Sequence, residues 1–230
     1  MKQLWKKFDK LSDDAYMSIA RRENGMDVWN QGFETLLEIV RTGREQNPQF
    51  ARELVQLDDD TDFEHGVCDW LTDYLDELDD QEQYEKLENA CREILELFDW
   101  KEDSPSDIRS LLSLALRAQG RKEEALEYCR GWYEEEPDNT VAAAALIYCL
   151  IECGELDRAE EAADRWIGDD TACDDNNDVV FMATIAVCRK KGDSEKEESL
   201  TNRLKIYEKE VENLLTGAVS FNDEEDDEWF

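Results

Sequence analysis

The chain has 230 residues, of which 41% are hydrophobic and only three are prolines. Sixty acidic residues against 26 basic ones give a formal net charge of −34, which disfavours direct binding to nucleic-acid phosphates and attracts basic proteins. Few prolines and few glycine-rich turns argue against a β-sandwich or barrel and favour helices.

Residues 1–60 are expected to form an N-terminal helical segment that packs on the rest of the chain. Lys6 and Lys10 lie one helical turn apart, and Trp5 and Phe8 belong to the apolar face of the same stretch. A basic amphipathic helix can bind a membrane or a partner. We expect this one to dock on its own acidic chain instead. The stretch has no apolar core of a signal peptide, so we expect no secretory signal.

The single histidine, His65, lies three residues before Cys68 and is the best candidate for a metal ligand. A metal site needs about four ligands, and no second pair of His or Cys residues stands out, so we predict no metal and no cofactor. The acidic run 58–62 lacks the glycine and final glutamate of an EF-hand loop and is interpreted as solvated loop and helix caps. With one histidine and no P-loop or nucleophile elbow, we predict no enzyme activity.

The seven cysteines are odd in number and lack CxxC spacing, which indicates free thiols in a reducing compartment. The sequence also contains no apolar run of about 18 residues, so we expect no membrane span. These two observations together predict a cytoplasmic protein.

Helical repeats are expected over 61–216, and between residues 120 and 166 three kinds of residue recur in pairs at a 34-residue period. A small helical hairpin cannot bury its apolar face alone, so hairpins of this period are expected to stack into a solenoid. The recurring pairs are Gly120 and Gly154, Ala125 and Ala159, and Trp132 and Trp166. The predicted helices are 107–119, 122–135, 142–153, 156–167, 178–191 and 194–215, with a further hairpin at 68–98.

The segment 120–126, Gly-Arg-Lys-Glu-Glu-Ala-Leu, and the spacing from Ala125 to Pro137 resemble the tetratricopeptide repeat. The resemblance covers about 106–168 and implies an all-α, helical-hairpin repeat solenoid that binds other proteins. The family usually has a small residue where Trp132 and Trp166 stand. We interpret both tryptophans as core side chains, because large aromatic residues dominate core packing.

In the resembled family the first helix of each hairpin lines a concave groove, which implies six partner-binding positions in this chain. Apolar anchors would supply affinity, and the flanking cations would orient an acidic or terminal group of the partner. The lysines and asparagines with which some members clamp chaperone tails are absent from the comparable positions. The six implied positions are Leu114, Arg117, Tyr148, Ile151, Arg189 and Lys190.

The last segment, 217–230, is too acidic to fold alone and is predicted to be a disordered tail. The sequence as a whole favours an adaptor or chaperone-like module that binds a protein or peptide, possibly a basic one, in the groove. The alternative is an acidic mimic of DNA that inhibits a nucleic-acid-binding protein. Binding by such a mimic would weaken steeply with salt.

Overall fold

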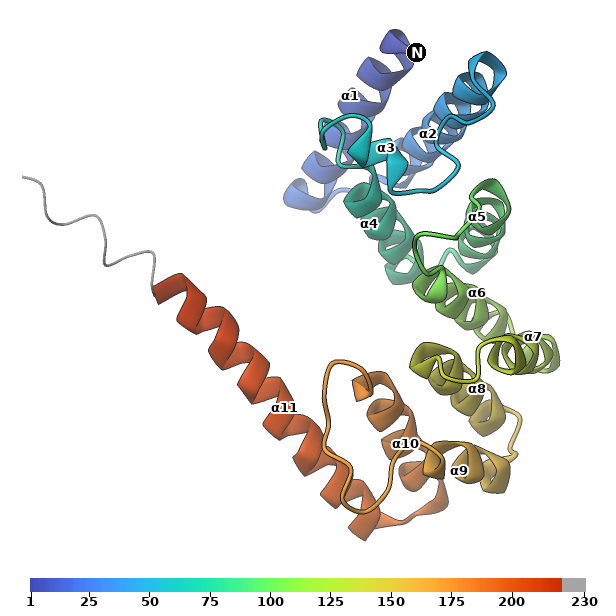
Figure 1. Cartoon of the computed structure of the whole chain (residues 1–230), viewed down its shortest axis with the longest axis vertical. Coiled ribbons are helices and arrows are strands. Elements are labelled where there is room, and N and C mark those ends of the chain that lie inside the picture. The colour runs from blue at the N-terminus through green and yellow to red at the C-terminus, as the bar shows by residue number, and fades with distance from the viewer. Residues whose placement is uncertain (221–230) are drawn as a thin grey trace, which may run out of the picture. The chain divides into compact units, whose positions relative to one another are not determined.

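The computed structural model describes residues 1–220, with side chains to Gly217, and every regular element among them is a helix (Figure 1). This confirms the all-α prediction. Residues 217–220 belong to the last helix, and the rest of the predicted tail, 221–230, lies outside the described residues. The helices are α1 (Lys2–Arg21), α2 (Met26–Gln46), α3 (Gln56–Asp59), α4 (Val67–Asp80), α5 (Tyr84–Leu97), α6 (Ser106–Ala118), α7 (Lys122–Glu135), α8 (Thr140–Glu152), α9 (Leu156–Asp164), α10 (Asp178–Lys191) and α11 (Ser194–Ser220).

Glycines mark three of the predicted helix breaks. Gly120, Gly154 and Gly192 follow the ends of α6, α8 and α10, with φ values of 77°, 78° and 78°. This left-handed conformation is open to glycine without the steric cost that a Cβ brings, and it stops a right-handed helix. Gly120 and Gly154 therefore end their helices one 34-residue period apart, and Gly192 follows 38 residues after Gly154.

The chain divides into two compact units, Met1–Gly120 and Arg121–Phe230. In the first unit, α1 packs on α2, α2 on α4, and α5 on both α4 and α6. Its core holds an aromatic cluster in which Trp70 stacks on Trp29 at 5.3 Å and meets Phe8 edge-on at 5.0 Å. All three rings are almost completely buried, so α1 contributes to the core of this unit through Phe8.

In the second unit, α8 packs on α7, α9 and α10, and α10 also packs on α11. The paired positions Ala125 and Ala159 are both fully buried, as expected where neighbouring helices approach closely. Trp132 is 1% exposed and confirms its interpretation as a core side chain. Trp166 is only half-buried, and it lies beyond the end of α9, which is at Asp164 rather than at the predicted 167.

A direct test of these close approaches is to enlarge the two alanines. We expect Ala125→Trp and Ala159→Trp each to lower the free energy of unfolding by about 1–3 kcal/mol, because neither site has room for an indole. Urea denaturation followed by circular dichroism measures the loss. Glu127→Trp adds the same ring at an exposed position of α7 and is the matched control. Equal stability of all three variants would contradict the repeat register.

Candidate functional site

The six predicted partner-binding residues fall in both units. Leu114 and Arg117 lie half-buried on α6, in the first unit. The other four belong to the second unit, where Tyr148 and Ile151 lie half-buried on α8 and share a face at a spacing of three residues. Arg189 and Lys190 are exposed at the end of α10.

Helices α8 and α10 pack against each other, so the structure sets the helix that carries Tyr148 beside the helix that carries Arg189. Met182 is one of the large apolar side chains that remain exposed, at 44%, and it lies two turns before Arg189 on α10. The Arg189 Nε atom pairs with Glu197 of α11 at 2.9 Å, so its charge is already partly compensated. We call the residues Tyr148, Ile151, Met182, Arg189 and Lys190 the α8–α10 face.

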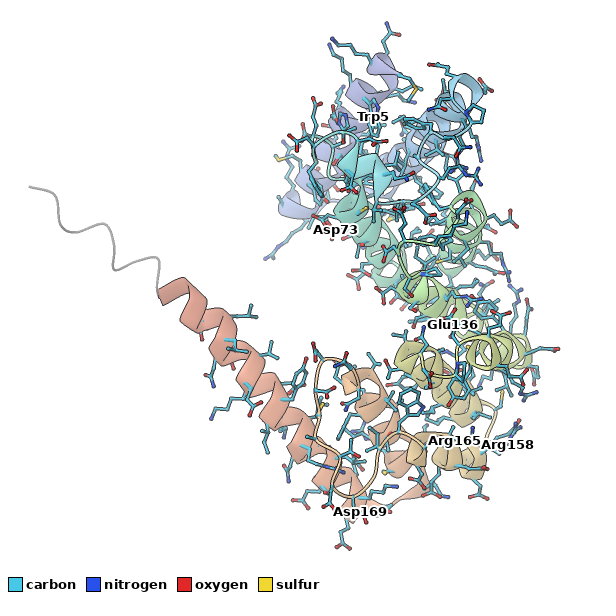
Figure 2. The ribbon with its side chains drawn as sticks, in the orientation of Figure 1. Trp5, Asp73, Glu136, Arg158, Arg165 and Asp169 are labelled. Atoms are coloured by element: carbon cyan, nitrogen blue, oxygen red, sulfur yellow. The ribbon has the colours of Figure 1, made fainter. Side chains whose placement is uncertain are left out.

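His65 has a structural environment rather than that of a metal ligand. Its Nδ1 atom lies 2.6 Å from a carboxylate oxygen of Asp9, and its ring stacks at 4.0 Å on Trp5 of α1, the helix on which Figure 2 labels this tryptophan. Burial raises the pKa of the neighbouring Cys68 thiol to about 12, which disfavours the thiolate that binds metals. Among the residues that the structure describes, no group of three His, Cys, Asp or Glu side chains could hold a metal ion.

The acidic run 58–62 was predicted to form a solvated loop and helix caps. Asp58 differs from this prediction because it is not solvated. Its side chain is only 3% exposed, and its two carboxylate oxygens accept hydrogen bonds from the Val67 and Cys68 backbone N–H groups at 2.7 and 2.8 Å. Asp58 therefore caps α4 from a separate segment of the chain, while Asp59 and Asp60 are exposed as expected.

Helix α4 ends in a dense acidic patch without a basic residue in its last turn. Burial, with repulsion from neighbouring carboxylates second, raises the pKa values of Asp76, Glu77 and Asp79 above their ordinary range. The partial negative charge at the C-terminal end of a helix adds to this repulsion. The patch therefore holds protons more tightly in the folded state than in the unfolded chain.

A group with a raised folded pKa contributes stability below its unfolded pKa and loses it as pH rises through the folded value. We therefore expect the melting temperature to rise as pH falls from 7 toward the ordinary carboxyl pKa range of 3.8 to 4.5, measured at low salt by circular dichroism. The combined Asp76→Asn and Asp79→Asn variant should show a weaker rise. A melting temperature that falls over this range in the unmodified chain would contradict the assignment.

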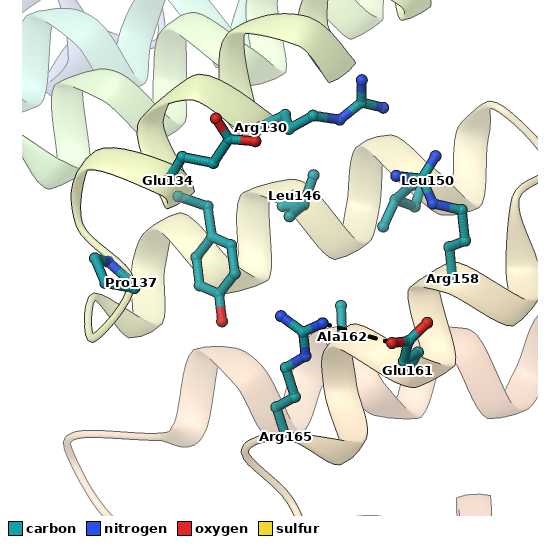
Figure 3. Close-up of a pocket in the computed structure, with 10 residues that line it drawn as sticks. Arg130, Glu134, Pro137, Leu146, Leu150, Arg158, Glu161, Ala162 and Arg165 are labelled. Carbon is teal, nitrogen blue, oxygen red and sulfur yellow. Dashed lines mark hydrogen bonds and ion pairs between the residues drawn. The ribbon is translucent and has the colours of Figure 1, made fainter.

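The second unit contains a pocket that the sequence did not predict, with a cavity volume of about 500 Å³ (Figure 3). Leu146 and Leu150 of α8 form its centre, and Arg130 of α7 and Arg165, which follows α9, approach them from opposite sides. We call it the arginine pocket. Its remaining lining residues are Tyr133, Glu134, Pro137, Arg158, Glu161 and Ala162.

The arginines of this pocket are only partly compensated. Arg158 pairs with Glu155 at the start of α9, and Arg165, the residue after α9, lies 3.5 Å from Glu161 (Figure 3). The Arg130 Nε–H is buried and has no hydrogen-bond acceptor among the described residues. Three arginines against Glu134 and Glu161 make the lining locally basic on a chain of net charge −34.

The pocket and the α8–α10 face use different sides of α8. Leu146 and Leu150 are four residues apart and point to one side, whereas Tyr148 lies about 200° around the helix from Leu146. Sequence analysis missed the pocket because nothing in the sequence distinguishes Leu146 and Leu150 from ordinary core residues. The one available signal was the seven-residue spacing of Arg158 and Arg165, which places both on one face of α9.

Consecutive helices that pack in a series, three pairs of them joined at a left-handed glycine, define an all-α helical-hairpin repeat protein. Residues 116–175, which include α7, α8 and α9, match the family model of the tetratricopeptide repeat. The match agrees with the resemblance that residues 106–168 show to this repeat. No protein with a curated description matches the chain. Tetratricopeptide repeats generally mediate protein–protein interaction and are typically not catalytic.

A helix long and apolar enough to cross a membrane does not occur among the described residues.

Proposed function

We propose that the chain is an adaptor or chaperone-like module that binds an extended peptide of a partner protein on the α8–α10 face. The observation that carries this proposal is the pairing of α8 and α10. Through this pairing, a helix with the half-buried residues Tyr148 and Ile151 lies against a helix with exposed Met182 and Lys190. Leu114 and Arg117 of α6 stay as predicted contacts in the first unit.

The chemistry of this face suits a peptide that combines an apolar side chain with a carboxylate. An aromatic ring such as that of Tyr148 offers a large apolar contact area together with a hydroxyl group. Apolar and aromatic anchors of this kind contribute most of the affinity in protein interfaces. Lys190 and Arg189 supply charge-assisted hydrogen bonds for an acidic side chain or a chain terminus.

The test is affinity capture with the full chain as bait. Tyr148→Ala combined with Arg189→Ala is expected to lose the captured partner while circular dichroism and melting stay nearly unchanged. Tyr207→Ala with Arg121→Ala removes the same two side-chain types from elsewhere in the unit and is the matched control. A folded double variant that still captures every partner of the unmodified chain would overturn the proposal.

Because Tyr148 is half-buried, its removal also risks unfolding the unit. The variant Arg189→Glu with Lys190→Glu changes only exposed positions, so we expect it to fold like the unmodified chain. It reverses the charge offered to a carboxylate, so we expect capture to fall by tenfold or more, about the effect of 1.4 kcal/mol. Unchanged capture by this folded variant would also count against the α8–α10 face.

The net charge of −34 favours one alternative, an acidic mimic of DNA that occupies a nucleic-acid-binding protein. Salt separates the two functions. Binding through many charges should weaken by orders of magnitude over a tenfold rise in salt, as phosphate contacts do. Binding through Tyr148 and Ile151 should survive the same change.

A further inference from the structure

We propose that the arginine pocket binds the acidic C-terminal segment 221–230 of a second copy of this chain. The pocket concentrates Arg130, Arg158 and Arg165, three of the twelve lysines and arginines of residues 121–230, around two leucines. This inference is independent of the proposed function, because the pocket lies on the other side of α8.

The chemistry of the segment complements that of the pocket. It carries six acidic side chains and two adjacent aromatic residues, Trp229 and Phe230. Guanidinium groups bind carboxylates through paired, charge-assisted hydrogen bonds. The rings of these two residues would contact the apolar lining of the pocket around Leu146 and Leu150, which are themselves 8% and 3% exposed.

The buried donor of Arg130 supports a ligand that brings acceptors. Its Nε–H has no acceptor among the described residues, and no ion pair compensates its charge there. Buried donors in folded proteins are nearly always satisfied. A carboxylate of the ligand that binds the outer guanidinium nitrogens of Arg130 would compensate the positive charge of this residue. Glu134 and Glu161 also line the pocket and oppose this binding, so the apolar contact must contribute.

The reach of the segment favours a second copy over the same copy. Lys196, near the start of α11, contacts Asp164 at 2.8 Å, next to the pocket residue Arg165. From Lys196 to Ser220 the helix rises by about 36 Å, and it runs away from α9 (Figure 1). Ten residues span at most about 36 Å when fully extended. The segment of one chain therefore cannot both return to its own pocket and lay its acidic residues there.

The first experiment uses a fluorescent peptide with the sequence of 221–230 and the full chain carrying Trp229→Ala and Phe230→Ala, so that its own terminus competes less. Anisotropy should show saturable binding. Adding Arg130→Ala and Arg165→Ala should weaken binding by tenfold or more. Arg121→Ala with Lys122→Ala, which removes the same number of charges outside the pocket, should leave binding within twofold. No saturable binding, or equal binding by the pocket variant, would overturn the proposal.

The second experiment tests the second copy. Sedimentation velocity at about 0.15 M salt, where the Debye length falls to about 8 Å and repulsion between acidic chains is screened, should show concentration-dependent association. Trp229→Ala with Phe230→Ala should abolish it. A chain that binds the peptide and stays monomeric at every concentration would contradict the assignment to a second copy. Tyr148→Ala with Arg189→Ala should change neither result, which separates this inference from the proposed function.

Discussion

Replacing Trp70 with alanine is expected to lower the free energy of unfolding of the Met1–Gly120 unit by about 3–5 kcal/mol. The indole is 1% exposed and stacks on Trp29 at 5.3 Å and on Tyr74 at 5.6 Å. Its removal would leave a cavity beside Gly32, where even a single added Cβ would come within 2.5 Å of the ring. Surrounding helices cannot close such a gap without losing their own contacts.

Urea denaturation followed by circular dichroism measures this loss, with the transitions of the two units fitted separately. Trp70→Phe is the control, because it keeps an aromatic ring in the stack and removes an indole N–H that has no acceptor among the described residues. We expect this variant to lose less than half as much stability as Trp70→Ala. A loss below about 1 kcal/mol for Trp70→Ala would show that this aromatic cluster is not the core of the unit.

The second large effect is expected from Asp58→Ala, which should cost about 2–4 kcal/mol. The substitution leaves the Val67 and Cys68 backbone N–H groups without the carboxylate oxygens that accept them at 2.7 and 2.8 Å. It also removes a negative charge from the N-terminal end of α4, where the helix dipole favours one. The net cost stays below the sum of both bonds, because the buried carboxylate is itself costly to desolvate.

Two variants bracket this prediction. Asp58→Asn keeps one acceptor oxygen and nearly the same volume, so its loss should be intermediate. Asp60→Ala changes an exposed acid of the same run and should stay within about 0.5 kcal/mol of the unmodified chain. Thermal melts of the three variants provide the comparison. Equal losses for Asp58→Ala and Asp60→Ala would mean that the hydrogen bonds to α4 contribute nothing.

Sequence periodicity was sufficient for the helical layout because its signals are local. Gly120, Gly154 and Gly192 stop their helices through backbone conformation alone, and Trp132 and Ala125 lie where a stripe of apolar residues faces a neighbour. These features depend on residues within a few helical turns of each other, so the local sequence pattern predicts them.

The features that sequence analysis missed depend on contacts between distant segments. Asp58 looked like its exposed neighbours, and only the fold brings it to the start of α4. The arginine pocket brings Arg130 of α7 together with Arg158 of α9 and Arg165, the residue after α9, around two leucines of α8. No regular sequence spacing predicts that Arg130 lies near Arg158. The prediction that Trp166 is a core side chain was wrong. The residue at which α9 ends, before this tryptophan, depends on how the following loop packs.

The measurement that tests the central claim most directly is site-specific photo-crosslinking from the α8–α10 face. A photoreactive phenylalanine replaces Met182, which is 44% exposed on α10, and in a second variant it replaces Glu127, which is exposed on α7. Both full-length variants are irradiated in lysate at physiological salt and again after a tenfold increase in salt. The α8–α10 face predicts a discrete crosslinked partner protein from position 182 at both salt concentrations and none from position 127. Crosslinks that arise equally from both positions and vanish at high salt would contradict it and assign binding to the acidic surface.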